Sequence, residues 1–163
     1  GQAATIYDKL EPCFTQSYGP EARGGAAGSQ VVIASDPIHH PHLIKPTNGI
    51  IMSQEAYAKY VPKLAVDATL LIDDGLVTLP EEHRQDLKTY GIPATQIAEE
   101  LGNSRAANTV MLGLWTAITG AVSRSAMQKS VADAVPAKPL EVNLKAFEAG
   151  YQKGLHDQDS SAL

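Results

Sequence analysis

Short apolar runs rich in β-branched residues alternate with helical patterns along this chain, and this alternation limits its fold more than any other feature. Val31–Ala34 and Leu70–Asp73 have the composition of strands that are buried on both faces. Helical patterns alternate with such runs along the chain, and the longest apolar helical stretch begins near residue 106. The sequence therefore predicts an α/β fold with an open, mainly parallel sheet and helices on both of its faces.

Length and charge limit the organisation and the partners of the chain. Its 163 residues suit one domain, which we expect over residues 1–155, followed by a polar and flexible tail over residues 156–163. A net charge of -5 without a long basic block argues against nucleic acid as a partner. No apolar run approaches the roughly 18 residues of a membrane span. The chain also opens without a signal-peptide pattern, so we expect a cytoplasmic protein.

Capping and turn residues predict where the helices begin and end. Ser53 has the position of a helix N-cap, and Pro62 would stop the helix that follows it. Thr95 is expected to cap another helix, directly after a short edge strand over residues 92–95. Helices are expected over residues 54–60, 96–101, 106–121, 125–135 and 141–151.

The connection between the strand-like runs Cys13–Thr15 and Gln30–Ala34 has an unusual composition. Within ten residues, Gln16–Gly25 contains three glycines, a proline, an acid, a base and a tyrosine. Such a segment forms either a wide surface turn with a solvated Glu21/Arg23 pair, or a loop whose backbone passes close to a ligand or partner. The residue pattern alone leaves both interpretations open.

Histidine and cysteine provide little support for a metal site. His39, His40 and His42 lie close together, but Pro41 interrupts them and no carboxylate or cysteine nearby completes a ligand set. We therefore favour a solvated or interface loop over a metal site here. Cys13 is the single cysteine, which excludes an internal disulfide and an iron–sulfur cluster held by this chain, and its apolar neighbours favour a structural role.

A few polar and aromatic residues in the predicted elements have two interpretations. Asp73 and Asp74 follow a predicted strand, where open α/β sheets place ligand contacts, but acids are also good turn formers, and we favour the structural role. Tyr57 and Tyr60 share one helix face and are expected to pack. Asn108 is expected early in a buried helix, where it would cap a loop end or face a cofactor.

Four segments of the chain, in this order, resemble the gamma subunit, or gamma-type domain, of 2-oxoacid:ferredoxin oxidoreductases. The most specific is SYGPEARGG, and the last of the four is most similar to subunits assigned to 2-oxoglutarate rather than to pyruvate. The four segments are Ser17–Gly25 (SYGPEARGG), Met52–Tyr57 (MSQEAY), Leu101–Gly113 (LGNSRAANTVMLG) and Asn143–Tyr151 (NLKAFEAGY).

The resemblance implies a Rossmann-like domain and a role in the oxidative decarboxylation of a 2-oxoacid to an acyl-CoA, with ferredoxin as electron acceptor. It implies thiamine diphosphate, Mg²⁺, iron–sulfur clusters and coenzyme A as co-substrate in the whole complex, with none bound by this chain alone. The implied partners are alpha-, beta- and ferredoxin-like delta-type subunits. The isolated chain would then be inactive, with no catalytic residue and no metal ligand of its own.

The resemblance also assigns a place to the glycine-rich loop, at the wall of the active site or of the coenzyme A entry. Arg23 would offer a planar donor fork to a carboxylate or phosphate, and Glu21 would orient it or contact a partner chain. The residues expected to contact a cofactor are Ser17, Tyr18, Gly19, Glu21, Arg23, Gly24, Gly25 and Asn108.

The start of the chain departs from the family pattern, in which a strand and a GxGGQG-like turn precede the first helix. Gly1–Tyr7 is expected to be the end of that helix, so the first strand and its turn are missing from this sequence. We expect an exposed apolar strip beside Val31–Ala34 or Leu70–Asp73, and a homodimer of the isolated chain that covers it. Two other functions remain open: a purely structural subunit, and a stand-alone nicotinamide or flavin enzyme, which lacks its GxGxxG turn here.

Overall fold

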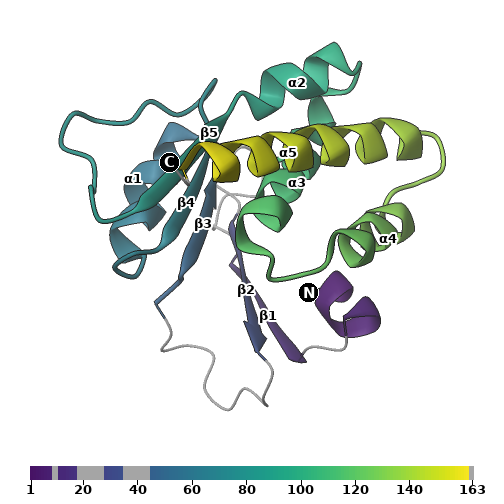
Figure 1. Ribbon diagram of the computed structural model, residues 1–163, viewed down its shortest axis with the longest axis horizontal. Coiled ribbons are helices and arrows are strands. Elements are labelled where there is room, and N and C mark those ends of the chain that lie inside the picture. Colours follow the sequence, from purple (N-terminus) through teal and green to yellow (C-terminus); the bar gives the residue numbers. More distant parts are fainter. Residues whose placement is uncertain (9–10, 18–27, 35–44, 162–163) are drawn as a thin grey trace.

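Three parallel strands form the central sheet of the molecule. The computed structural model describes residues 1–8, 11–17, 28–34 and 45–161. The strands β3 (Asn48–Ile51), β4 (Thr69–Asp73) and β5 (Lys88–Ile92) lie side by side in this order. Helices lie on both faces of the sheet (Figure 1). The predicted α/β fold with a parallel sheet is confirmed.

Four of the five expected helices begin and end within about two residues of the predicted positions, and the fifth begins within one. α1 (Gln54–Tyr60) has the predicted bounds because the Ser53 hydroxyl accepts a hydrogen bond from the Ala56 amide, 3.2 Å away. A short 3₁₀ turn, η3 (Val61–Lys63), follows and leads to β4. The other helical elements are η1 (Ala3–Tyr7), α2 (Ala94–Glu100), η4 (Ser104–Ala106), α3 (Ala107–Thr119), α4 (Arg124–Ala134) and α5 (Leu140–Ser161).

The strands on either side of the glycine-rich segment form an antiparallel hairpin instead of joining the parallel sheet. β1 (Glu11–Ser17) pairs with β2 (Gly28–Ala34), and Ser17 lies opposite Gly28 in the last rung of the ladder. Val31 is 40% exposed. The prediction that Val31–Ala34 is buried on both faces is therefore wrong, because an apolar β-branched run also suits a two-stranded ribbon.

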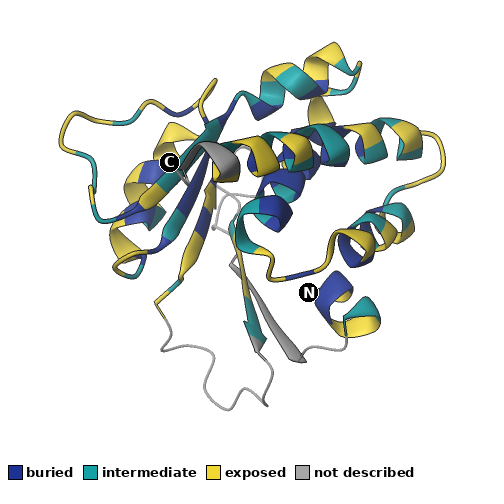
Figure 2. Cartoon of the chain, in the orientation of Figure 1, coloured by how far each residue is buried: buried dark blue, intermediate teal, exposed yellow. Residues whose placement is uncertain are grey.

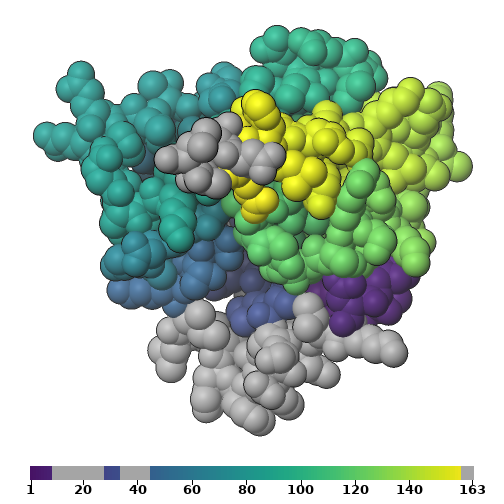
Figure 3. Space-filling view, in the orientation of Figure 1, coloured from purple at the N-terminus to yellow at the C-terminus, as the bar shows by residue number. Residues whose placement is uncertain are grey.

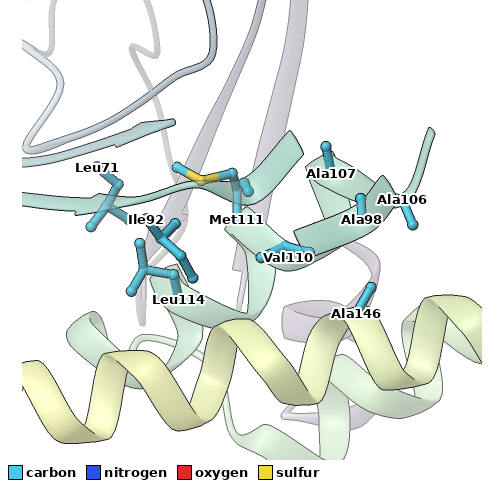
Figure 4. Close-up of a cluster of buried hydrophobic side chains, with 10 residues drawn as sticks. Leu71, Ile92, Ala98, Ala106, Ala107, Val110, Met111, Leu114 and Ala146 are labelled. Carbon is cyan, nitrogen blue, oxygen red and sulfur yellow. The ribbon is translucent and has the colours of Figure 1, made fainter. Parts of the chain in front are cut away.

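The side chains of β4 alternate between two cores, one on each face of the sheet. Leu70 and Ile72 pack toward α1 and η3, where they meet Tyr57 and Val61. Leu71 points to the other face and packs with side chains of β5, α2, α3 and α5 (Figure 4). In Figure 2 the buried residues follow β4 and the inner side of α3. An apolar strip at Leu70–Asp73 is therefore covered within the chain, whereas Val31 and Ile50 are each 40% exposed.

The third parallel strand begins earlier than the sequence suggests. β5 covers Lys88–Ile92 and pairs with β4 from the Thr69–Lys88 rung onward. The edge strand expected over residues 92–95 is therefore shifted, since Pro93 has no amide proton for a ladder and α2 begins directly at Ala94. The segment over residues 74–87 that joins β4 to β5 contains no helix.

α3 and α5 approach each other so closely that their backbones touch. A Cβ atom built at Gly113 would lie 2.0 Å from the Phe147 carbonyl oxygen. Gly150 has the reciprocal position, 1.9 Å from the Val110 carbonyl oxygen. In the space-filling view the atoms of α5 lie directly against those of α3 (Figure 3). The close approach of the two backbones thus explains two glycines that cost helix propensity.

The last helix is longer than expected and holds the end of α3. α5 continues to Ser161, so residues 156–161 are helical and are not an irregular tail. The Gln158 side-chain amide donates hydrogen bonds to the carbonyl oxygens of Ala117 and Ile118, each at 3.0 Å. These two carbonyls lie in the last turn of α3, where no intrahelical donor reaches them.

The first turn of the chain packs against α4. The Asp8 carboxylate accepts hydrogen bonds from the Ser123 amide at 2.6 Å and from the Ser123 hydroxyl at 2.8 Å. The Ser123 hydroxyl in turn accepts a hydrogen bond from the Ala126 amide and caps α4. Ala3 and Ala4 are buried against Phe147 and the apolar face of α4. The residues of η1 are therefore a fixed part of the fold.

Candidate functional site

The carboxyl ends of the three parallel strands lie at one edge of the sheet, which is where open α/β sheets bind ligands. Ser53 follows β3, Asp73 ends β4, and Thr95 follows β5. Each of these polar residues already has a partner within the chain: Ser53 caps α1, and Asp73 and Thr95 bind each other. This edge is therefore held together by its own hydrogen bonds.

Asp73 is fully buried and caps a helix that lies far from it in the sequence. Its Oδ2 accepts hydrogen bonds from the Thr95 amide at 3.0 Å and from the Thr95 hydroxyl at 2.5 Å. Its Oδ1 accepts a third from the Gly75 amide at 3.2 Å. The carboxylate of Asp73 thus takes the capping role predicted for Thr95, which lies in the first turn of α2. The structural interpretation of Asp73 is supported.

Asp74 differs from its neighbour because its side chain is exposed. Its carboxylate lies against Gly91, where a Cβ would be 2.9 Å from Oδ2. Partial loss of hydration raises the pKa of Asp74, and the charge of Asp73 raises it further, while Lys153 acts in the opposite direction. Asp74 is therefore the titratable group at this edge that keeps contact with solvent.

Most of the sequence-predicted site residues lie outside the described residues. Ser17 is the last residue of β1, whereas Tyr18, Gly19, Glu21, Arg23, Gly24 and Gly25 are outside the described ranges. Asn108 is described near the start of α3, and it is exposed. Its Oδ1 accepts a long hydrogen bond of 3.4 Å from the Thr109 hydroxyl. Thr109 is the polar residue of this segment that is buried, and its hydroxyl donates to Asn143 Oδ1 at 2.8 Å.

The metal interpretation of the sequence concerns three histidines that follow β2 in the chain. His39, His40 and His42 fall outside the described residues. Within the described ranges, no group of three or more histidine, cysteine, aspartate or glutamate side chains has an arrangement suited to a metal ion. In the same part of the chain no helix is long and apolar enough to cross a membrane.

A contact that the sequence did not predict lies at the loop end of the β1–β2 hairpin. The Tyr60 hydroxyl occupies the space beside Gly28, where a Cβ would lie only 2.8 Å from it. The ammonium groups of Lys59 and Lys63 lie 5.3 Å and 5.5 Å from the centre of the Tyr60 ring. No sequence pattern links residues 28 and 60, so only the folded chain reveals this pair.

A shallow groove of about 250 Å³ lies between α1, η3 and the segment that leads to β5. One of its walls is fixed by Arg84, whose guanidinium donates to the carbonyl oxygens of Leu64 at 2.9 Å and Ala65 at 3.2 Å. The same guanidinium pairs with the Asp86 carboxylate. The groove is lined by Tyr57, Ala58, Val61, Pro62, Pro80, Glu82, His83 and Arg84. Since the Arg84 guanidinium is fully engaged, it is not available to bind an anion in the groove.

We expect Arg84→Lys to loosen this segment, because an ammonium group lacks the planar fork that reaches two carbonyls and a carboxylate together. The hydrogen bond from Arg84 lowers the pKa of Asp86 below its ordinary value of 3.8. A lowered folded-state pKa adds stability above the unfolded pKa, and this stability is lost as the pH falls through the lowered value. The variant should melt about 3 °C lower at pH 7.

Carboxyl-detected NMR titration of the variant should show the pKa of Asp86 moving back toward its ordinary value. Arg105→Lys, on the exposed surface of η4, is the matched control and should leave both the melting temperature and the Asp86 titration unchanged. An unchanged Asp86 titration in Arg84→Lys would show that this ion pair does not hold the segment.

Comparison with known proteins shows which family the chain resembles. The model of the pyruvate ferredoxin/flavodoxin oxidoreductase family matches residues 2–153. Subunit KorC of 2-oxoglutarate synthase from Methanocaldococcus jannaschii is 45% identical over 153 residues, which cover 93% of this chain and 82% of KorC. A crystal structure of the gamma subunit of a keto/oxoacid ferredoxin oxidoreductase from Geobacter sulfurreducens superposes with a TM-score of 0.83 at 37% identity, over 95% of this chain and 86% of that chain.

A larger enzyme shares the same fold. The structure of 2-oxoglutarate:ferredoxin oxidoreductase from Magnetococcus marinus, with 2-oxoglutarate, coenzyme A and succinyl-CoA bound, matches all of this chain with a TM-score of 0.79. The match covers 30% of that polypeptide at 22% identity, so it shows the fold alone.

The chain belongs to the pyruvate ferredoxin/flavodoxin oxidoreductase family, as the match over residues 2–153 shows. It is therefore a subunit of an oxidoreductase complex. Within the family it is of the gamma type and is most like the gamma-type subunits of the 2-oxoglutarate enzymes. The resemblance seen in the four sequence segments is confirmed.

Proposed function

We propose that this chain is the gamma-type subunit of a complex that oxidatively decarboxylates 2-oxoglutarate to succinyl-CoA and passes two electrons to ferredoxin. The observation that carries the proposal is the 45% identity to KorC over 93% of the chain. The complex would also contain alpha-, beta- and ferredoxin-like delta-type subunits. Thiamine diphosphate with Mg²⁺ and the iron–sulfur clusters would supply the carbon chemistry and the electron path.

The described residues of this chain do not fit a thiamine diphosphate site of their own. A diphosphate suits the N-terminus of a helix, where free amides point outward. At α1, α2 and α4 one of those amides already binds Ser53, Asp73 or Ser123, respectively. The described residues also hold no metal-ligand cluster, and the single cysteine cannot hold an iron–sulfur cluster. We therefore assign these groups to the partner subunits and derive no step through them in this chain.

The segment Ser17–Gly25 is the part of the chain that we propose to face the shared active site or the entry of coenzyme A. Ser17 ends one strand of a hairpin that stands apart from the parallel sheet, as Figure 1 shows. In this role Arg23 binds a carboxylate or phosphate, while Gly24 and Gly25 allow a close approach. Tyr18, Gly19, Glu21 and Asn108 remain proposed contacts of the same site.

Reconstitution of the complex tests the proposed substrate. The chain is co-expressed with the three partner subunit types, and reduction of methyl viologen is measured with 2-oxoglutarate, pyruvate and 3-methyl-2-oxobutanoate in the presence of coenzyme A. We expect kcat/KM to be highest for 2-oxoglutarate, and omission of this chain to abolish turnover. Equal rates for all three oxoacids, or turnover by the isolated chain, would contradict the proposal.

Arg23→Ala in the same complex tests the role of the loop against that of a purely structural subunit. Removal of a charged donor that binds substrate should lower kcat/KM about tenfold and raise the KM for 2-oxoglutarate or coenzyme A. Arg105→Ala provides the control, because Arg105 is exposed on η4. Unchanged kinetics for Arg23→Ala in an intact complex would favour the structural alternative.

A further inference from the structure

The last rung of the β1–β2 hairpin is in contact with the body of the domain through one side chain. Ser17 and Gly28 form this rung, and the rung at the opposite end of the ladder is Glu11–Ala34. Tyr60 belongs to α1, which follows β3 of the parallel sheet. Its hydroxyl and ring lie beside Gly28 and so connect the hairpin to the helix.

Gly28 is a glycine because of space and not because of its backbone conformation. It does not have the positive φ that excludes other residues. A Cβ at this position would lie 2.8 Å from the Tyr60 hydroxyl oxygen and 3.2 Å from Cζ. An alanine would therefore push the ring or the rung aside. The two residues fit each other as one unit.

The Tyr60 ring is held from its own helix as well. Lys59 and Lys63 place their ammonium groups 5.3 Å and 5.5 Å from its centre, within the range of a cation–π contact. Neither lysine has a carboxylate partner among the described residues. The Tyr60 ring therefore has contacts with two cations of its own segment as well as with Gly28 of the hairpin.

We propose that Tyr60 is a positioning residue for the active site of the complex. By fixing the rung Ser17–Gly28, it sets the position of this end of the hairpin backbone relative to the shared site. This inference rests on the proposed function, since it takes the Ser17 end of the hairpin to be the part that faces the reaction. Tyr60 itself contacts no substrate in this account.

A misplacement of about 1 Å at a site of this kind can cost up to about a hundredfold in rate. A merely structural role would instead appear as a loss of stability. The two roles therefore separate when turnover and stability are measured on the same variants.

The test is a double-mutant cycle in the reconstituted complex, built from Gly28→Ala, Tyr60→Phe and the double variant. Tyr60→Phe keeps the ring and removes the oxygen that the new methyl group would meet. Gly91→Ala is the matched control, since its Cβ would meet Asp74 Oδ2 at 2.9 Å, away from the hairpin. Tyr57→Phe controls for the loss of a hydroxyl on the same helix.

We expect Gly28→Ala to lower kcat/KM for 2-oxoglutarate about tenfold, with the melting temperature and subunit content of the wild-type complex. Tyr60→Phe should change kcat/KM less than Gly28→Ala, and the double variant should be about threefold better than Gly28→Ala alone. Both controls should keep wild-type kinetics. In the isolated chain, amide exchange over residues 11–17 and 28–34 should show the same non-additivity.

Additive effects of the two substitutions on kcat/KM would overturn the positioning role, even if amide exchange shows that the two residues are in contact. Decreases in kcat/KM that are matched by decreases in the melting temperature would overturn it as well. A wild-type complex that fails to reduce viologen with every oxoacid would instead overturn the proposed function, and the inference would fall with it. Activity of the wild-type complex therefore distinguishes the two failures.

Discussion

Gly150→Ala is expected to lower the free energy of unfolding by about 3 kcal/mol, near the upper end of the range for an overpacked core. The added methyl group would lie 1.9 Å from the carbonyl oxygen of Val110 and 2.8 Å from its carbonyl carbon. Because the obstacle is the backbone of α3, no change of rotamer removes the clash, and the two helices must move apart. Urea unfolding followed by circular dichroism measures the loss.

Gly154→Ala gives a graded comparison on the same helix. Its Cβ would meet the Ala117 Cβ at 2.6 Å and the Leu114 carbonyl oxygen at 3.1 Å. Since the nearest obstacle is a side chain, we expect a loss of about 1–2 kcal/mol. Ala117→Gly should recover part of this loss, and it should not help Gly150→Ala. A wild-type urea midpoint for Gly150→Ala would show that α3 and α5 do not pack at this distance.

Asp73→Ala is expected to cost about 3 kcal/mol, because it leaves the Thr95 amide and hydroxyl and the Gly75 amide without their acceptor. Asp73→Asn should be little better. The single carbonyl oxygen of asparagine cannot accept from both Thr95 and the Gly75 amide, and its NH₂ group would face one of these donors. Urea unfolding gives the free energy, and amide exchange at Thr95 and Gly75 locates the change.

The neighbouring residue provides the control for this prediction. Asp74 carries the same carboxyl group one position later, but it is exposed. We therefore expect Asp74→Ala to change the free energy of unfolding by less than about 0.5 kcal/mol. Equal losses for the two variants would mean that the hydrogen bonds of Asp73 contribute little to the fold.

The elements that could be predicted from the sequence are those specified by local interactions. Ser53 and Pro62 define α1 because a cap and a helix breaker act within a few residues. α3 covers Ala107–Thr119, close to the expected residues 106–121, and ends directly before Gly120. The alternation of strands and helices indicated a parallel sheet, and β3, β4 and β5 form one.

The errors arose where residues far apart in the sequence decide the structure. The pattern of Val31–Ala34 does not reveal which strand it pairs with. In the structure β2 pairs with β1, and Val31 remains 40% exposed to solvent. Thr95 is a residue type that often caps helices. In the structure, however, the carboxylate of Asp73, at the end of β4, accepts the hydrogen bond from the Thr95 amide and so caps α2. Such contacts depend on the assembled sheet and leave no local signal.

The candidate site could be predicted only in part. The segment Ser17–Gly25 was singled out by its composition, and its resemblance to a family is supported by the match over residues 2–153. The contacts of its individual residues remain predictions. The helix around Asn108 was expected to be buried, and most of α3 is, whereas Asn108 itself lies on its exposed side. The contact between Tyr60 and Gly28 had no signal in the sequence.

The close packing of α5 on α3 has a consequence for biosynthesis. A ribosome delivers every strand of the sheet and all of α3 before it delivers α5, which holds the glycines that α3 requires as neighbours. Until then the side of α3 that α5 covers in the finished fold has no partner, and the nascent domain leaves this apolar surface open to water. We therefore expect a nascent chain stalled before Leu140 to be more prone to aggregation than the complete chain.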